Sequence, residues 1–303
     1  MPTYEVLDTF PAFRRFWGSA RGLPIRRQLD GWRDDYLQPW PELAKKQIAN
    51  YADEGIDWRR IARDRVFPTL DERLPTMERV RDQLRRAIPV AVRRCREKLG
   101  MSFPVTFVIH VGIGCGAGWA TTFRGNSAVL FGVENAAEHE WSDRETAVAL
   151  VEHELAHLVH DDWRRRARAD ARGSPTGLWW QLYEEGFATR CEFLLGTIGL
   201  HHSTRRGRDW VGWCRENRGR LAAKLLQAAQ SKRSLRRFFG SWYDVDGYTE
   251  TGYFLGSEVI RDWESRFTLR QIAGWNAREI RSRGRASLRR FAQESGAVGP
   301  AKT

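Results

Sequence analysis

The feature that most constrains this chain is a short polar cluster inside a helical segment that is otherwise apolar. Ala147–Val151 is an apolar run, and His153, Glu154 and His157 follow it within six residues. Leu155-Ala156, between the two histidines, also suits a buried helix. Because buried imidazole and carboxylate groups cost free energy unless they find partners, such a helix needs groups that satisfy them together. The segment therefore predicts an internal helix that carries a polar site.

The spacing of the two histidines suits a shared metal ion. Residues four apart on a helix are separated by about 40° around its axis, so both rings leave the same face. Neutral imidazole binds zinc at about 2.0–2.1 Å. Glu154, beside the first histidine, is placed to deprotonate a metal-bound water rather than to bind the ion. His153 to His157 thus matches the pattern H-E-x-x-H and predicts a Zn2+ site with Glu154 as general base.

A catalytic zinc site of this kind needs a third protein ligand and leaves one position for water. His160 lies near the same helix face as His153, and Asp161 and Asp162 follow it, although these two aspartates fit a helix end or solvent better. The metzincin pattern H-E-x-x-H-x-x-G-x-x-H requires Gly and His where this chain has His160 and Trp163. Its own spacing excludes the metzincin class.

A second motif lies downstream and brings a family resemblance. Trp179–Ala188 contains Glu-Glu-Gly-Phe-Ala and resembles the second motif of the gluzincin peptidases, whose glutamate is the third zinc ligand. The layout is similar to a bacterial group of predicted zinc-dependent proteases, in which a strand-rich segment precedes the metal helix and a Gly-Tyr-x-x-Gly element follows. That element is Gly252–Gly256 here. The resemblance covers about residues 101–265 and implies a zincin-like fold and peptide hydrolysis.

The resemblance assigns the third ligand to Glu185, since Gly186 and Ala188 follow it as in the family motif. Small residues there would let this helix pack closely on the metal helix. Glu184 is the competitor, but it lies about 100° further round the helix, so both carboxylates cannot face the ion equally. Glu184 is expected to contact a substrate amine or a neighbouring residue of the site, or to face solvent.

Gluzincins commonly use a phenol from a later helix to stabilise the oxyanion of the transition state, and a hydrogen-bond donor is what that charge requires. The resemblance offers Tyr253, which lies in the Gly-Tyr-x-x-Gly element, and Tyr248 as the alternative. Both are predicted as catalytic residues together with Glu154, with Tyr253 preferred. The competing interpretation for either tyrosine is a packed aromatic ring whose hydroxyl is satisfied internally.

Another match concerns substrate binding. Gly132–Asn135 is similar to the Gly-x-Met-Glu-Asn signature with which clan aminopeptidases hold a free substrate amine, but it lacks the Met. Glu134 as an amine anchor is therefore the less favoured interpretation. Ala128–Val133 is interpreted chiefly as the sheet edge along which an extended peptide adds as a further strand.

The pattern of the chain predicts an α+β fold, a mainly helical zincin-like catalytic domain with a small mixed sheet before the H-E-x-x-H helix. Strands are expected at Phe103–His110, Trp119–Phe123 and Ala128–Val133. Ser142 or Asp143 can cap the metal helix, which is expected to end near His160 before a polar loop. Further helices are expected at Met77–Leu99, Leu178–Leu195, Asp209–Gln230, Gly252–Arg266 and Ser287–Glu294.

Three regions are expected along the chain: a helical N-terminal region, 1–100; the gluzincin-like catalytic domain, 101–275; and a basic helical C-terminal tail, 276–303. The four cysteines are scattered without metal-ligand spacing and are expected to be free thiols.

Composition limits the partners. Of 303 residues 42% are apolar, which favours a folded globule. The net charge of +12 comes nearly all from Arg, and the Arg residues are spread along the chain without forming one stripe, so only weak, salt-sensitive polyanion binding and no specific nucleic acid is expected. No segment predicts a membrane span or a signal peptide, which makes the cytoplasm the expected location.

The expected partner is a peptide or protein substrate. The alternative is a non-catalytic zinc-binding regulatory protein or a nucleic-acid-associated protein, although a purely structural zinc site has no need of Glu154. The sequence leaves the oligomeric state open.

Overall fold

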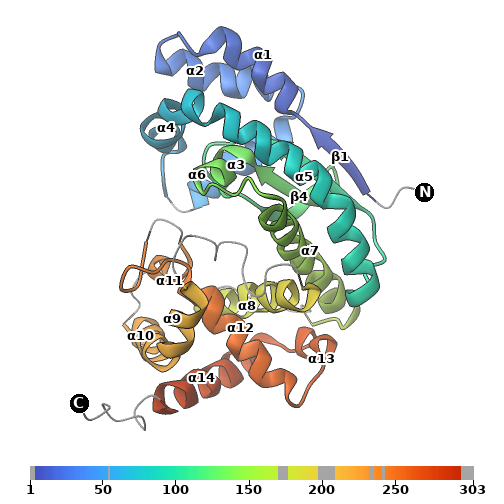
Figure 1. Ribbon diagram of the computed structural model, residues 1–303, viewed down its shortest axis with the longest axis vertical. Helices are drawn as coiled ribbons and strands as arrows, with labels where there is room; N and C mark the ends of the chain where they lie inside the picture. Colours follow the sequence, from blue (N-terminus) through green and yellow to red (C-terminus); the bar gives the residue numbers. More distant parts are fainter. Residues whose placement is uncertain are drawn as a thin grey trace. The chain divides into compact units, whose positions relative to one another are not determined.

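The computed structural model describes residues 4–53, 55–169, 177–196, 209–231, 235–240 and 243–294. The described residues are mainly helical with one small mixed sheet, so the α+β class expected from the sequence is confirmed (Figure 1). Contacts within the chain divide it into two compact units, Met1–Leu158 and Val159–Thr303. The sequence-based boundaries near residues 100 and 275 stay a prediction.

The first unit is built on a four-stranded sheet of order β1-β2-β4-β3, with β1 at Tyr4–Asp8, β2 at Val105–His110, β3 at Trp119–Phe123 and β4 at Asn126–Gly132. β2 pairs in parallel with β1 and with β4, and β3 pairs antiparallel with β4. Every residue of β2 is buried, as its continuous run of β-branched and aromatic residues requires. The expected strands are present, and β1 is an addition that the sequence analysis missed.

This strand order corrects one expectation. Ala128–Val133 was interpreted as the sheet edge, yet β4 lies between β2 and β3 and has no free edge. The glycine-rich connection after β2 leads into β3, which turns back through Gly125 and pairs along β4, so β3 covers the edge that β4 would otherwise present. The free edges of the sheet belong to β1 and β3.

The helices of the first unit come mostly from its first hundred residues. They are α1 (Phe10–Ala20), α2 (Ile25–Gly31), η1 (Trp32–Tyr36), α3 (Pro41–Asp53), α4 (Trp58–Ile61), η2 (Ala62–Val66), η3 (Phe67–Thr69), α5 (Leu70–Leu99), α6 (Val133–Glu138) and the start of α7 (Arg144–Arg166).

Polar side chains join these first helices to the carboxyl end of β2. Thr9 donates to the carbonyl of Ile109 at 3.1 Å, Trp32 Nε1 donates to the carbonyl of Val111 at 3.1 Å, and the Tyr36 hydroxyl accepts from the Val111 amide at 3.0 Å. All three contacts are buried. The first strand and helices of the chain therefore share a sheet and a core with β2.

Helix α5 is longer than the expected Met77–Leu99. It begins at Leu70 and continues through Pro75 and Pro89, and it ends at Gly100, whose φ of 69° is readily adopted only by glycine. Its buried face carries the apolar residues whose spacing predicted it: Val80, Leu84, Ile88, Val92 and Cys95.

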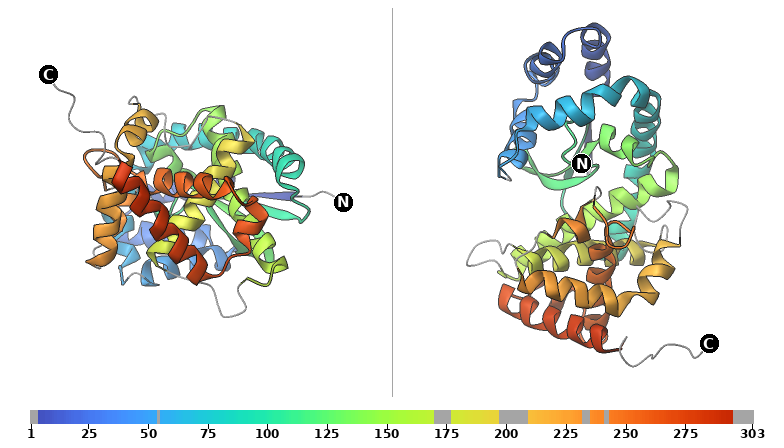
Figure 2. Two further views of the ribbon diagram at one scale, coloured as in Figure 1. Left: turned by 90° about the horizontal axis from the view of Figure 1, so that it is seen from below. Right: turned by 90° about the vertical axis from the view of Figure 1, so that its left-hand side faces the viewer.

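The second unit is helical. It contains the end of α7 and then α8 (Leu178–Leu195), α9 (Trp210–Glu216), α10 (Arg218–Gln230), α11 (Arg236–Phe239), α12 (Thr251–Glu264), α13 (Leu269–Ala273) and α14 (Ala277–Glu294). Helix α14 runs beside α10 (Figure 2).

Three boundaries differ from expectation. The segment expected as one helix at Asp209–Gln230 is broken at Asn217 into α9 and α10. Helix α14 begins ten residues before the expected Ser287. Helix α7 does not end near His160 but continues to Arg166, because Asp162 pairs with Arg166 at 2.8 Å, one turn on. Residues 173–176 of the expected polar loop lie outside the described residues.

Helices α8 and α12 pack with almost no side chain between them. A Cβ atom on Gly186 would lie 2.2 Å from the carbonyl carbon of Gly256, and one on Gly256 would lie 2.3 Å from the carbonyl oxygen of Leu182. Both glycines are therefore required where the two backbones cross. Within the described residues, no helix combines the length and the apolar character needed to cross a membrane.

Candidate metal centre

Helix α7 presents the polar cluster from inside the core. Asp143 caps the helix, since its Oδ1 accepts from the amides of Glu145 at 3.0 Å and Thr146 at 2.9 Å. Of the two expected caps, Asp143 is thus the one that the structure uses. The following turns are apolar and buried, and His153 and Glu154 are only 2% and 6% exposed. The sequence thus forms a helix whose polar groups His153 and Glu154 lie among buried apolar residues.

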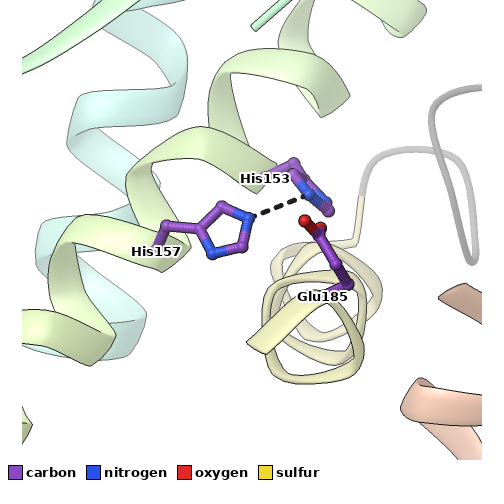
Figure 3. Close-up of side chains that lie close together, drawn as sticks. All are labelled: His153, His157 and Glu185. Carbon is purple, nitrogen blue, oxygen red and sulfur yellow. Dashed lines mark hydrogen bonds between the residues drawn. The ribbon is translucent and has the colours of Figure 1, made fainter. Parts of the chain in front are cut away.

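The structure brings three predicted ligands together. The Nε2 atoms of His153 and His157 lie 3.2 Å apart, and these two rings form a group with Glu185 of α8 in which one ligand atom of each residue lies within 4.8 Å of the others (Figure 3). His153 is buried, and His157 and Glu185 are partly exposed. Among the described residues, this is the one cluster of His, Cys, Asp and Glu side chains with such geometry.

The cluster fits zinc by its chemistry. Two imidazole nitrogens and one carboxylate oxygen form a donor set found in catalytic zinc sites, which keep a fourth position open. Two nitrogens at about 2.0–2.1 Å from a tetrahedral ion lie about 3.3 Å apart, and the observed separation of the two Nε2 atoms is 3.2 Å. A hydrogen bond between neutral imidazole tautomers gives a similar spacing, so the carboxylate is the more informative member of the group.

Of the two adjacent glutamates, Glu185 belongs to the cluster and Glu184 does not. Gly186, which follows, does not serve the purpose expected for it. It faces Gly256 of α12, not α7, so the small residue allows α8 to approach α12. Gly256 of the Gly-Tyr-x-x-Gly element has the same use, because it lies against Leu182 and Gly186 of α8, whereas Gly252 makes room for Phe239 of α11.

Glu154 is held by the edge strand β3. Its Oε2 accepts a hydrogen bond from the Ala120 amide at 2.8 Å. Gly118 leaves space for the same carboxylate, because a Cβ atom there would lie 2.4 Å from Glu154 Oε1. The Ala120 amide donates to Glu154 instead of to β4, so the carboxylate lies at the free edge of the sheet.

The residue before His153 anchors α7 to α5. Glu152 is fully buried, and Arg94 of α5 donates to it at 3.0 Å. A buried carboxylate is tolerated only when it is paired, so this contact fixes the rotation of α7 about its axis.

His160, weighed above as a third ligand, has a different partner. Its Nε2 lies 2.8 Å from the hydroxyl of Tyr183 on α8, and that hydroxyl donates to the carbonyl of Ile272 at 3.1 Å. Since Tyr183 precedes Glu185 by two residues on α8, this chain of contacts fixes the helix that carries the carboxylate. Asp161 and Asp162 lie within α7 and outside the metal cluster.

Arg164 was missed by the sequence analysis. It is 1% exposed, its Nη1 donates to the carbonyls of Ala273 at 2.8 Å and Trp275 at 3.0 Å, and its guanidinium lies over the ring of Trp180 at 4.6 Å. The basic run of three arginines at this point predicted only a solvated loop, and nothing in it distinguished the first arginine from the other two.

The two tyrosines lie near each other in sequence but in different surroundings. Tyr253 is in the first turn of α12, with its ring 5.9 Å from that of Phe239. Tyr248 lies before the helix and stacks on Trp213 at 3.8 Å with an interplanar angle of 11°. Both side chains are partly exposed. The catalytic role of each stays a prediction.

Glu134 binds the protein's own backbone. Its two carboxylate oxygens accept from the amides of Gly112 at 2.7 Å and Gly114 at 3.1 Å, and the residue is 2% exposed. Burial raises the pKa of this carboxyl, while the backbone hydrogen bonds act in the opposite direction. These contacts hold the glycine-rich connection after β2 in place. They argue against the interpretation of Glu134 as an anchor for a substrate amine.

Comparison with known proteins returned no relative: no family model matches the chain, and neither a curated protein nor a solved structure shows significant similarity to it.

Proposed function

We propose that the protein is a zinc-dependent peptidase of the gluzincin type. The observation that carries this proposal is the group formed by His153, His157 and Glu185, whose ligand atoms lie within 4.8 Å of one another, next to the buried carboxylate of Glu154. The family motifs at His153–His157 and Glu184–Ala188 support it from the sequence.

In this proposal the two histidines and Glu185 hold the ion. When bound, zinc supplies Lewis acidity that lowers the pKa of water towards about 7 and polarises a carbonyl. Glu154 accepts the proton of the attacking water and passes it to the leaving amine. Its hydrogen bond to the Ala120 amide orients the carboxylate for this transfer.

The free edge of β3 is the place for an extended substrate. A peptide that adds to β3 pairs with backbone groups directly beside Ala120, whose amide already contacts Glu154. Recognition through the backbone fits a peptide bond as the reacting group. A tyrosine hydroxyl, from Tyr253 or Tyr248, is the proposed donor to the oxyanion.

The test is Glu154→Gln in the full chain. An amide cannot accept the proton, so we expect zinc content and the unfolding midpoint to be retained while hydrolysis falls by about a thousandfold. Zinc is measured by elemental analysis, and hydrolysis by mass spectrometry of a digested peptide library. Undiminished hydrolysis by a zinc-loaded variant would refute the mechanism.

The ligand assignment has its own matched pair. Glu185→Gln is expected to lose most of the zinc and Glu184→Gln to retain it, because only Glu185 lies in the cluster. The reverse result would transfer the ligand role to Glu184. Zinc binding by the unmodified protein without hydrolysis of any library peptide would favour a non-catalytic zinc protein.

A further inference from the structure

The six arginines of α14 fall into two classes. Arg283 lies over the rings of Trp275 at 4.4 Å and Phe267 at 4.9 Å, and Arg290 pairs with Asp262. The other four are exposed, and none of them forms an ion pair or ring contact with any residue in the described parts of the chain. We call these four the arginine stripe: Arg278, Arg281, Arg285 and Arg289.

The helical period aligns the arginine stripe. At 3.6 residues per turn the four Cα positions fall within an arc of about 80°, and they extend over about 16 Å along the axis. Ala292 falls within this arc, and Ser282, Gln293 and the buried Leu288 are the nearest residues beside it; none of them is charged. The sequence analysis expected a basic helical tail at 276–303 but no stripe, because it treated the Arg residues as spread along the whole chain.

No acidic residue of α14 neutralises the arginine stripe. Glu279 accepts from the Asn276 amide at 3.0 Å at the start of the helix, and Glu294 pairs with Arg218 at 2.5 Å. Arg281, Arg285 and Arg289 follow one another at a spacing of four residues, an arrangement of like charges that destabilises a helix. Among the residues of this unit that the structure describes, no ion pair or ring contact offsets this repulsion.

We propose that the arginine stripe is a docking surface for the phosphodiester backbone of a nucleic-acid strand. Arginine's planar fork matches phosphate oxygens bidentately, and α14 contains arginine and no lysine. A line of about 16 Å spans about five phosphates at 3.4 Å per nucleotide. Because the contacts reach phosphates alone, binding does not depend on base sequence.

An anionic membrane fits this surface less well. A helix that lies on a membrane inserts a free apolar face. In α14 the apolar side chains, Ile280, Leu288 and Phe291, are buried within the protein. The stripe itself presents no large apolar side chain.

The test compares two variants with the same loss of charge. Arg278, Arg281, Arg285 and Arg289 are replaced by Gln in one. In the other, Gln replaces four arginines of the first unit that are exposed and, within the described residues, unpaired: Arg15, Arg21, Arg26 and Arg27. Binding of a labelled 20-nucleotide single strand of mixed sequence is followed by fluorescence anisotropy between 50 and 200 mM salt.

The stripe variant is expected to bind at least tenfold more weakly at 100 mM salt, and the slope of log K against log salt is expected to fall by about 3, as four phosphate contacts at about 0.7 each require. The control variant is expected to change affinity less than threefold. Zinc content and peptide hydrolysis should be unchanged in both, which separates this proposal from the proposed function.

Equal losses in the two variants would overturn the proposal, since binding would then follow net charge. So would an unmodified protein that does not bind the strand at 50 mM salt. Stripe-dependent binding of phosphatidylserine vesicles or an acidic peptide that exceeds binding of the strand would assign the surface to another class. If thermal melting shows the quadruple variant unfolded, Arg281→Gln with Arg285→Gln should give about half the change in slope.

Discussion

The two halves of α7 carry similar residues and use them differently. In the first half, His153 and His157 face each other and the carboxylate of Glu185. In the second half, the His160 ring contacts the Tyr183 hydroxyl, and Arg164 donates to two backbone carbonyls at and after α13. His153 in the first half and His160 and Arg164 in the second are all buried, so burial of a polar residue does not mark a site. The nature of the partner does: the proposed ligand groups face one another, while His160 contacts a tyrosine hydroxyl and Arg164 contacts backbone carbonyls.

The largest expected effect comes from replacing one histidine in each half of α7 by alanine, in two separate variants. His157→Ala removes a proposed ligand and should abolish zinc binding and hydrolysis with little change in the unfolding midpoint. His160→Ala should keep the zinc but lower the free energy of unfolding by about 1–3 kcal/mol, because the buried Tyr183 hydroxyl loses a partner. Elemental analysis and chemical denaturation measure the two effects. Zinc loss in His160→Ala without loss of stability would break the comparison.

The next effect tests whether each of the two tyrosines, Tyr253 and Tyr248, acts in the site or only packs within the fold. If Tyr253 donates to the oxyanion, Tyr253→Phe should lower kcat by about a hundredfold with KM and zinc nearly unchanged, since the bond forms only in the transition state. Tyr248→Phe should leave kcat intact, because the Tyr248 ring is stacked on Trp213. The opposite pattern in steady-state kinetics would exchange the two roles.

A smaller effect is expected where the protein makes room for Glu154. In Gly118→Ala the added Cβ would lie 2.4 Å from the carboxylate, so Glu154 must shift. We expect kcat to fall about tenfold with zinc retained, since displacement of a catalytic group by about 1 Å costs up to a hundredfold. Gly18→Ala is the matched control, because nothing lies within 4 Å of that position. An active Gly118→Ala would show that the contact does not position Glu154.

The last effect is on stability alone and concerns a buried histidine outside the cluster. Burial lowers the pKa of His110 from 6.5 to about 4. The unfolded chain therefore binds this proton more tightly, and stability present above about pH 6.5 is lost as pH falls towards 4, by at most about 3 kcal/mol. Denaturation of His110→Gln should show a correspondingly weaker dependence over this range. An unchanged dependence would mean that the fold does not lower the pKa of His110.

The local sequence pattern predicted those residues of the candidate site that lie together on one helix. His153, Glu154 and His157 follow from helical spacing, and α8 was predicted with its observed ends. Glu185 needed the family resemblance, because spacing alone does not separate it from Glu184. The cluster that now includes it depends on how α7 and α8 pack.

Contacts between segments that lie far apart in the chain could not be predicted from the sequence. The order of the strands in the sheet decides which strand lies at an edge. The sequence did not reveal this order, so β4 was predicted at the edge that β3 occupies. The glycines of α8 and α12 were noticed as small residues, but their use depends on which helix they face. Nothing local distinguishes Arg164 from Arg165 and Arg166, although only Arg164 is buried.

The pairing of β1 with β2 has a consequence for how the chain acquires its structure. Tyr4 lies opposite Val105, so the ladder joins segments about a hundred residues apart. Contacts of such long range slow folding, because the loop between them must close before they contribute. During synthesis at about 5–20 residues per second, β1 waits at least several seconds for β2. Throughout that interval its backbone groups remain open to chaperones, or to pairing with the wrong strand.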